Sequence, residues 1–185
     1  MTSRRFLLAL GVLVVVVVVA LTLEGRSWLG SCPSFALWEG DIWSSCCSQR
    51  FLDPYSFTHV LHGMVFCGAL ALLLPRSSLL FRGLLALTLE GLWEVAENSP
   101  VIIQRYREAT IALGYVGDSL LNSLGDLLCC GAGFFLAHLL GWKKAAVVFV
   151  LTEIALLFWV RDNLILNVLM LLFPIDAIKA WQMGR

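Results

Sequence analysis

Charged residues are scarce in this chain. They make up only 14% of its 185 residues, whereas hydrophobic residues make up 59%, and the mean hydropathy is +0.86. This balance excludes an ordinary soluble domain and is typical of a protein that crosses a membrane several times. An excess of basic charge is absent too, because 13 Lys and Arg balance 13 Asp and Glu. We therefore expect no nucleic-acid partner.

The sequence also lacks the short motifs that identify many enzymes. It contains no glycine-rich phosphate loop, no nucleophile elbow of a serine hydrolase and no CxxC metal signature. Any chemistry must therefore come from polar side chains that separate apolar segments bring together.

Six apolar segments stand out between the polar stretches. The first, residues 6–23, is an uncharged run of 18 residues, longer than the roughly 7 to 15 apolar residues usual in a cleaved signal peptide. We expect it to be an uncleaved span. The other expected spans are residues 56–74, 79–98, 117–140, 145–160 and 164–181, the last with a kink or an interfacial helix at Pro174. The predicted fold is an all-α, polytopic transmembrane helix bundle of about six spans. It forms a single membrane domain, 1–185, with a five-helix core in residues 56–181.

The basic residues predict the orientation of this bundle. With the N-terminus in the cytoplasm, eight of the thirteen face the cytoplasm, as the positive-inside rule requires: Arg4, Arg5, Arg76, Arg82, Lys143, Lys144, Lys179 and Arg185. Residues 26–55 then form an extracytoplasmic loop, whose three tryptophans suit the membrane interface. In that oxidising compartment Cys32 could pair with either Cys46 or Cys47.

Acidic residues between positions 90 and 126 mark the functional centre. Glu90, Glu94 and Glu97 are spaced to share one helix face, and a second helix repeats this pattern with Asp118, Asn122 and Asp126. Ionisable groups inside a span cost roughly 2.5 to 3.5 kcal/mol each, so they usually face a polar interior. We expect them to meet near the outer face of the membrane.

A metal site is the chemistry that these residues favour. His59 and His62 begin the second span, and imidazole with carboxylate is the usual ligand set of zinc, iron or manganese. The predicted ligands of a divalent metal are His59, His62, Glu94 and Asp118. Glu97 is the predicted general base for a metal-bound water. The connection 99–117 should fold back over the bundle, so that Arg105, Arg107 and Arg161 hold an anionic group of the substrate. The same pattern is compatible with interhelical hydrogen bonds and ion pairs.

The remaining polar residues fall into two groups. Counting about 1.5 Å per residue places Glu90, Asp126 and Glu153 roughly 10 to 12 Å below the outer acids, in an inner layer. The others are expected to hydrogen-bond between helices near the site: Asn98, Asn122, Asp162, Asn163 and Asn167. The glycines expected at close contacts between helices are Gly63, Gly68, Gly125, Gly131 and Gly133.

Three long motifs carry a resemblance to a known family. THVLHG, WEVAENSPVIIQRYREATIALGYVGDSLLNSLGD and RDNLILNVLMLLFPIDAIKAWQ resemble an uncharacterised bacterial family of multi-pass membrane proteins of unknown function. This resemblance implies a location in the bacterial inner membrane and no particular activity. A weaker likeness to VanZ-like membrane proteins rests on Asp118-x-x-x-Asn122-x-x-Gly125 and a His early in a helix.

These features give three hypotheses of function. The first is a metal-assisted hydrolase or transferase acting at the outer leaflet on a lipid-linked or otherwise anionic substrate of the cell envelope. The second is an ion- or proton-coupled transporter, with the inner layer as a proton relay. The third is a structural subunit of a membrane complex, which predicts that all buried polar groups are paired with one another.

Overall fold

The structure is a computed structural model that describes residues 1–184, and this part of the chain is all-helical. Its helices are α1 (Ser3–Leu23), α2 (Ser56–Leu73), α3 (Leu79–Glu97), α4 (Pro100–Ala109), α5 (Leu120–Leu140), α6 (Trp142–Val160), α7 (Leu164–Leu172) and α8 (Asp176–Gln182). An isolated bridge joins Trp38 to Leu52. The predicted all-α class is confirmed.

Three helices, α1, α2 and α5, are long and apolar enough to cross a membrane. They correspond to the predicted spans 6–23, 56–74 and 117–140. α3 and α6 have 19 residues each, about 28 Å of helix, but each carries at least three charged residues and does not reach the same apolar standard. The helices therefore indicate a membrane protein.

The expected sixth span, residues 164–181, is not one helix. α7 ends at Leu172 and α8 begins at Asp176, because Pro174 between them lacks the N–H that a continuing helix needs. The nine residues of α7 measure about 14 Å, which is half of the hydrocarbon thickness or less. This segment alone does not cross a bilayer.

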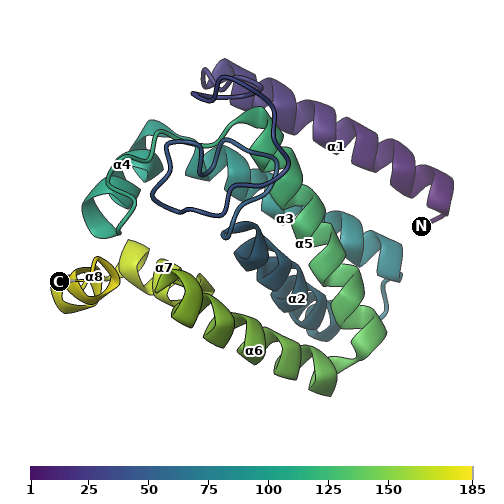
Figure 1. Cartoon of the computed structure of the whole chain (residues 1–185). Helices are drawn as coiled ribbons and strands as arrows, with labels where there is room; N and C mark the ends of the chain where they lie inside the picture. The colour runs from purple at the N-terminus through teal and green to yellow at the C-terminus, as the bar shows by residue number, and fades with distance from the viewer. Residues whose placement is uncertain (185) are drawn as a thin grey trace.

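α2, α3 and α5 form the centre of the molecule (Figure 1). α1 packs on α3 along one side, while α6 lies along α2 and α5 on the opposite side. α4, α7 and α8 gather at one end, where α4 contacts α7. The loop between α1 and α2 crosses the same end. Any site under this loop is therefore bordered by segments that lie far apart in the sequence.

α2 and α5 approach each other closely at glycines. A Cβ atom on Gly63 would lie 1.9 Å from the carbonyl oxygen of Cys130, and one on Gly133 would lie 1.9 Å from that of Val60. A side chain at either position would therefore push the helices apart. The predicted close-packing role is confirmed for these two glycines. It is wrong for Gly68, whose Cβ would meet nothing within 4 Å.

The loop of residues 26–55 is fastened to itself and to the start of α5. Cys32 forms a disulfide with Cys46, and Cys47 is a free thiol. The Gln49 side chain donates from Nε2 to the Gly117 carbonyl over 2.8 Å. These contacts hold the loop as a fixed cover above the ends of α2 and α5.

The turn between α3 and α4 folds the next segment back over the bundle. α3 ends at Glu97, and the hydroxyl of Ser99 then accepts from the Ile102 N–H at the start of α4, with Pro100 as its first residue. Proline suits this position because the first helical N–H has no partner within the helix. The fold-back predicted for residues 99–117 is confirmed.

Candidate metal centre

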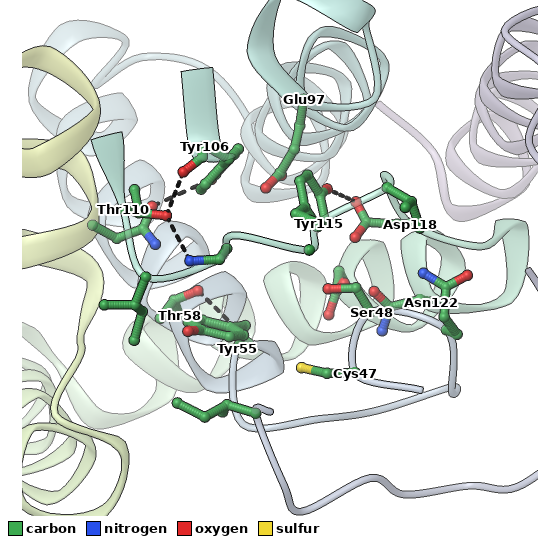
Figure 2. Close-up of a pocket in the computed structure, with 18 of the residues that line it drawn as sticks. Cys47, Ser48, Tyr55, Thr58, Glu97, Tyr106, Thr110, Tyr115, Asp118 and Asn122 are labelled. Carbon is green, nitrogen blue, oxygen red and sulfur yellow. Dashed lines mark hydrogen bonds between the residues drawn. The ribbon is translucent and has the colours of Figure 1, made fainter. Parts of the chain in front are cut away.

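A cavity of about 400 Å³ lies under the loop and α4 (Figure 2). Its lining includes side chains of α2, α3, α4, α5, α7 and the loop. Both histidines expected at the site line it, together with three acids, Glu97, Asp118 and Asp126. Glu97 points into this space between the rings of Tyr106 and Tyr115.

His59 and His62 share one acceptor, Glu90 of α3. Their spacing of three residues places both on the same face of α2, and their rings are 5.1 Å apart. Nδ1 of His59 lies 2.5 Å from Glu90 Oε1, and Nδ1 of His62 lies 3.1 Å from both carboxylate oxygens. Glu90 is therefore fixed between two imidazoles.

The other nitrogen of His59 faces α5. Its Nε2 lies 3.8 Å from Asp126 Oδ2, while Asp126 Oδ1 accepts from the hydroxyl of Ser56 over 2.8 Å. The Glu94 carboxylate lies 3.5 Å from His59 Nδ1. One ligand atom from each of His59, Glu94 and Asp126 falls within 4.8 Å of the other two, and the same holds for His59, His62 and Glu90.

Glu94 differs from its neighbours because it has no hydrogen-bond partner within the described residues. The residue has no exposed surface, and neither carboxylate oxygen accepts a hydrogen bond within the described residues. A buried polar group without a hydrogen bond costs roughly 1 to 3 kcal/mol, and a charged one costs more. The arrangement is therefore incomplete without a further group beside Glu94.

Asp118 is not among these clusters, although we expected it to be a ligand. Its Oδ2 accepts from Asn98 Nδ2 over 3.0 Å and from the Tyr115 hydroxyl over 2.9 Å. Burial raises the pKa of Asp118, which lies just outside α5, to about 6, and the donors from Tyr115 and Asn98 oppose that rise. Asp126, expected in an inner layer, stands beside His59 instead.

The three arginines expected to hold an anion are used elsewhere. Each donates to a main-chain carbonyl: Arg105 to Leu171 over 2.7 Å, Arg107 to Tyr115 over 2.5 Å, and Arg161 to Trp181 over 3.2 Å. Within residues 1–184, the ion pairs to carboxylates all come from His59 and His62. The expected approach of Arg105 and Arg107 to the site is wrong, because chain ends and turns near them offer free carbonyls.

Of the expected inner layer, Glu90 and Asp126 both lie beside His59, whereas Glu153 does not join them. Glu153 accepts from the N–H groups of Leu164 and Ile165 over 3.0 and 3.1 Å, so it caps the first turn of α7. Helix N-termini carry such unpaired N–H groups and favour a carboxylate. Glu153 is therefore a structural residue and has no part in a relay with Glu90 and Asp126.

The other predicted polar residues form hydrogen bonds between segments, and of these Asn122 and Asn167 line the cavity. Asn98 holds Asp118, Asn122 donates to the Arg50 carbonyl, Asn163 donates to the Glu153 carbonyl, Asn167 accepts from Tyr106, and Asp162 accepts from Gln182 and the Asn163 N–H. We did not foresee Tyr106, Tyr115 and Ser56 at the site. A tyrosine in a polar connection and a serine at the start of a span carry no distinctive spacing.

The fold and the site define a helical membrane protein with a buried histidine–carboxylate cluster beneath a disulfide-closed loop. Residues 21–184 match the model of a family described as a protein of unknown function (DUF2585). The chain belongs to this family, as its motifs predict. The likeness to VanZ-like proteins stays a prediction.

Relatives of similar length occur in several bacteria. The chain is 43% identical to a UPF0314 protein of Sphingopyxis alaskensis over 98% of this chain and 97% of the relative. It is 46% identical to the UPF0314 protein R03235 of Rhizobium meliloti over 96% and 90%. With the UPF0314 protein NGR_c32320 of Sinorhizobium fredii it shares 48% identity over 88% and 82%. No solved structure matches the chain.

Proposed function

We propose that this protein is a metal-assisted hydrolase or transferase of the bacterial inner membrane. The observation that carries the proposal is the buried Glu94 carboxylate, which has no hydrogen-bond partner and lies beside His59 and Asp126. A divalent zinc, iron or manganese ion would supply the missing partner. A purely structural role predicts a fully paired cluster, which Glu94 does not fit.

The ligand set follows from which atoms are still free. His59 offers Nε2, since its Nδ1 is held by Glu90 at 2.5 Å, and a metal-bound histidine usually donates its other N–H to a carboxylate in this way. Glu94 and Asp126 supply the oxygens. Three protein ligands leave a position for water, as in catalytic zinc sites. His62 is held by the same Glu90 and lines the cavity beside this position.

The chemistry would take place at the cavity side of the cluster. A bound metal lowers the pKa of its water and polarises a carbonyl or phosphoryl oxygen. Glu97, one helical turn from Glu94 toward the end of α3, faces the cavity and is placed to take the proton of that water. A lipid-linked substrate of the cell envelope fits this position, with the metal in place of the arginines as the partner of its anionic group.

The proposed topology has about six apolar segments and a cytoplasmic N-terminus. α1, α2, α3, α5 and α6 would cross the bilayer, and α7 and α8 would lie at the outer face. Lys179 of α8, expected in the cytoplasm, would then lie outside, where its ammonium donates to the Glu108 carbonyl of α4. The disulfide between Cys32 and Cys46 supports an oxidising, extracytoplasmic side for the loop, and the basic residues of the short loops support the same orientation. The site would then open to the outside of the inner membrane.

Metal analysis of the purified protein tests the proposal. We expect about one divalent ion per chain in wild type and none in His59→Ala or Glu94→Gln. Glu90→Gln should lower the metal affinity roughly 10- to 100-fold, because it removes the group that orients His59. Glu108→Gln is a matched control on the exposed face of α4. A wild-type protein without metal after purification and reloading would overturn the proposal.

A further inference from the structure

The cavity has an unusual balance of charge. Among the described residues no lysine or arginine lines it, whereas Glu97, Asp118 and Asp126 do. A metal held by His59, Glu94 and Asp126 would neutralise Asp126 but would leave Glu97 and Asp118 without a cation. Charges in a buried site are costly unless they are paired. A ligand that brings positive charge to the cavity would supply the cation that these two acids lack among the lining residues.

Both acids offer oxygens to such a ligand. The two side-chain donors to Asp118, from Asn98 and Tyr115, contact Oδ2, so Oδ1 is left for a ligand. Glu97 is 9% exposed, and its hydrogen-bonding neighbour is the hydroxyl of Tyr106, whose proton is directed to Asn167 at 3.2 Å. The Glu97 carboxylate points into the cavity beside this hydroxyl (Figure 2), and no described lysine or arginine lines the cavity near it.

Aromatic rings and apolar side chains complete the surroundings of the two acids. The rings of Tyr106 and Tyr115 meet edge to face with centroids 5.1 Å apart, and aromatic faces attract organic cations. Apolar lining residues come from α7 and the connection after α4: Leu164, Val168, Leu171, Ile111 and Leu113. Leu113 and Val168 on this wall are also 51% and 45% exposed. An acyl or prenyl chain can therefore leave the cavity along this wall.

We infer that the cavity binds an amphiphile whose head group carries an amine, with the ammonium at Asp118 and the tail along α7. The inference rests on the proposed function, since the reacting group of the same molecule would lie at the metal. A zwitterionic phosphoethanolamine head has both parts, a phosphate for the metal and an ammonium for Asp118. Anionic heads without an amine leave Asp118 and Glu97 unpaired.

Native mass spectrometry of the full chain in dodecyl maltoside tests the amine site and the metal site separately, because it counts bound lipid and bound metal in the same measurement. The probes are lysophosphatidylethanolamine and lysophosphatidylglycerol with the same tail. Wild type should bind the ethanolamine lipid about tenfold more tightly, since a partly desolvated charge pair discriminates between head groups. Asp118→Asn should remove this preference, and Glu97→Gln should reduce it. Glu108→Gln should leave it unchanged.

Glu94→Gln distinguishes the amine site from the metal site. It should lose the metal and retain the preference for the ethanolamine lipid, because Asp118 and the two tyrosines are untouched. Equal binding of both lipids by wild type, or a preference that survives Asp118→Asn, would overturn the inference even if metal is bound. An ethanolamine preference without any metal would overturn the proposed enzyme instead and would support the amine site.

Discussion

The centre of the bundle and its C-terminal part both bury carboxylates, but they satisfy them differently. In the segment from α6 to α8, Glu153 and Asp162 each accept hydrogen bonds from main-chain or side-chain N–H groups. In α2, α3 and α5, Glu90 meets only imidazoles and Glu94 has no donor. Carboxylates whose oxygens all have hydrogen-bond donors hold a fold together. A clustered carboxylate without a donor indicates a missing ligand.

The two regions also differ in how their acids are brought together. The central acids depend on the close crossing of α2 and α5, whereas the C-terminal acids depend on hydrogen bonds to helix ends. Three variants test this difference. One alters the crossing of α2 and α5, one removes the cap of α7, and one changes the protonation of Asp162.

The largest effect should come from Gly133→Ala. A Cβ there would lie 1.9 Å from the Val60 carbonyl oxygen, so α2 and α5 must separate, and overpacking against backbone costs about 3 kcal/mol or more. Thermal unfolding in detergent should show the loss, and bound metal should fall because His59 and Asp126 move apart. Gly68→Ala, which meets nothing within 4 Å, is the control. Equal melting temperatures for the two variants would contradict the tight crossing.

A smaller effect should follow Glu153→Ala. The change leaves the N–H groups of Leu164 and Ile165 without their acceptor, which should lower the free energy of unfolding by about 3 kcal/mol. Metal content should stay at the wild-type value, because Glu153 is not part of the cluster. Glu94→Gln should show the reverse, with no metal and little loss of stability in the metal-free protein. Loss of metal in Glu153→Ala would contradict the separation of Glu153 from the cluster.

The sequence predicts the helices of this molecule better than it predicts how far they are offset from one another along the axis of the bundle. Apolar run length located α1, α2 and α5, and the Asn98-Ser99-Pro100 step located the turn after α3. The depth count failed because it assumed that all spans begin at one level. Since His59 meets Glu90, α2 must begin roughly 6 Å below the end of α3, from the positions of the two residues in their helices at about 1.5 Å each. No local pattern encodes that offset.

The candidate site was predictable in residue type and only partly in membership. Imidazole and carboxylate on adjacent apolar segments gave His59, His62 and Glu94 at one place. The choice of Asp126 over Asp118 depends on the crossing of α2 and α5, which is a tertiary property. The arginines were misplaced because their preferred partners, the free carbonyls after Leu171 and near Tyr115, exist only once the helices have ended.

The smallest predicted effect concerns Asp162, which lies between α6 and α7. Burial raises the pKa of this carboxyl to about 6, against the lowering effect of donors that include Asn163, Asn167 and Gln182. Between the usual value of 3.8 and about 6, the folded protein therefore holds a proton that the unfolded chain has released. Stability must fall as the pH rises through this interval, by at most about 3 kcal/mol in all, and then level off. Asp162→Asn cannot ionise, and its amide oxygen can still accept from Gln182. Between about pH 4 and about pH 7, the melting temperature of this variant should therefore change less than that of wild type. Identical pH profiles for the two proteins would show that the C-terminal donors already offset the burial of Asp162.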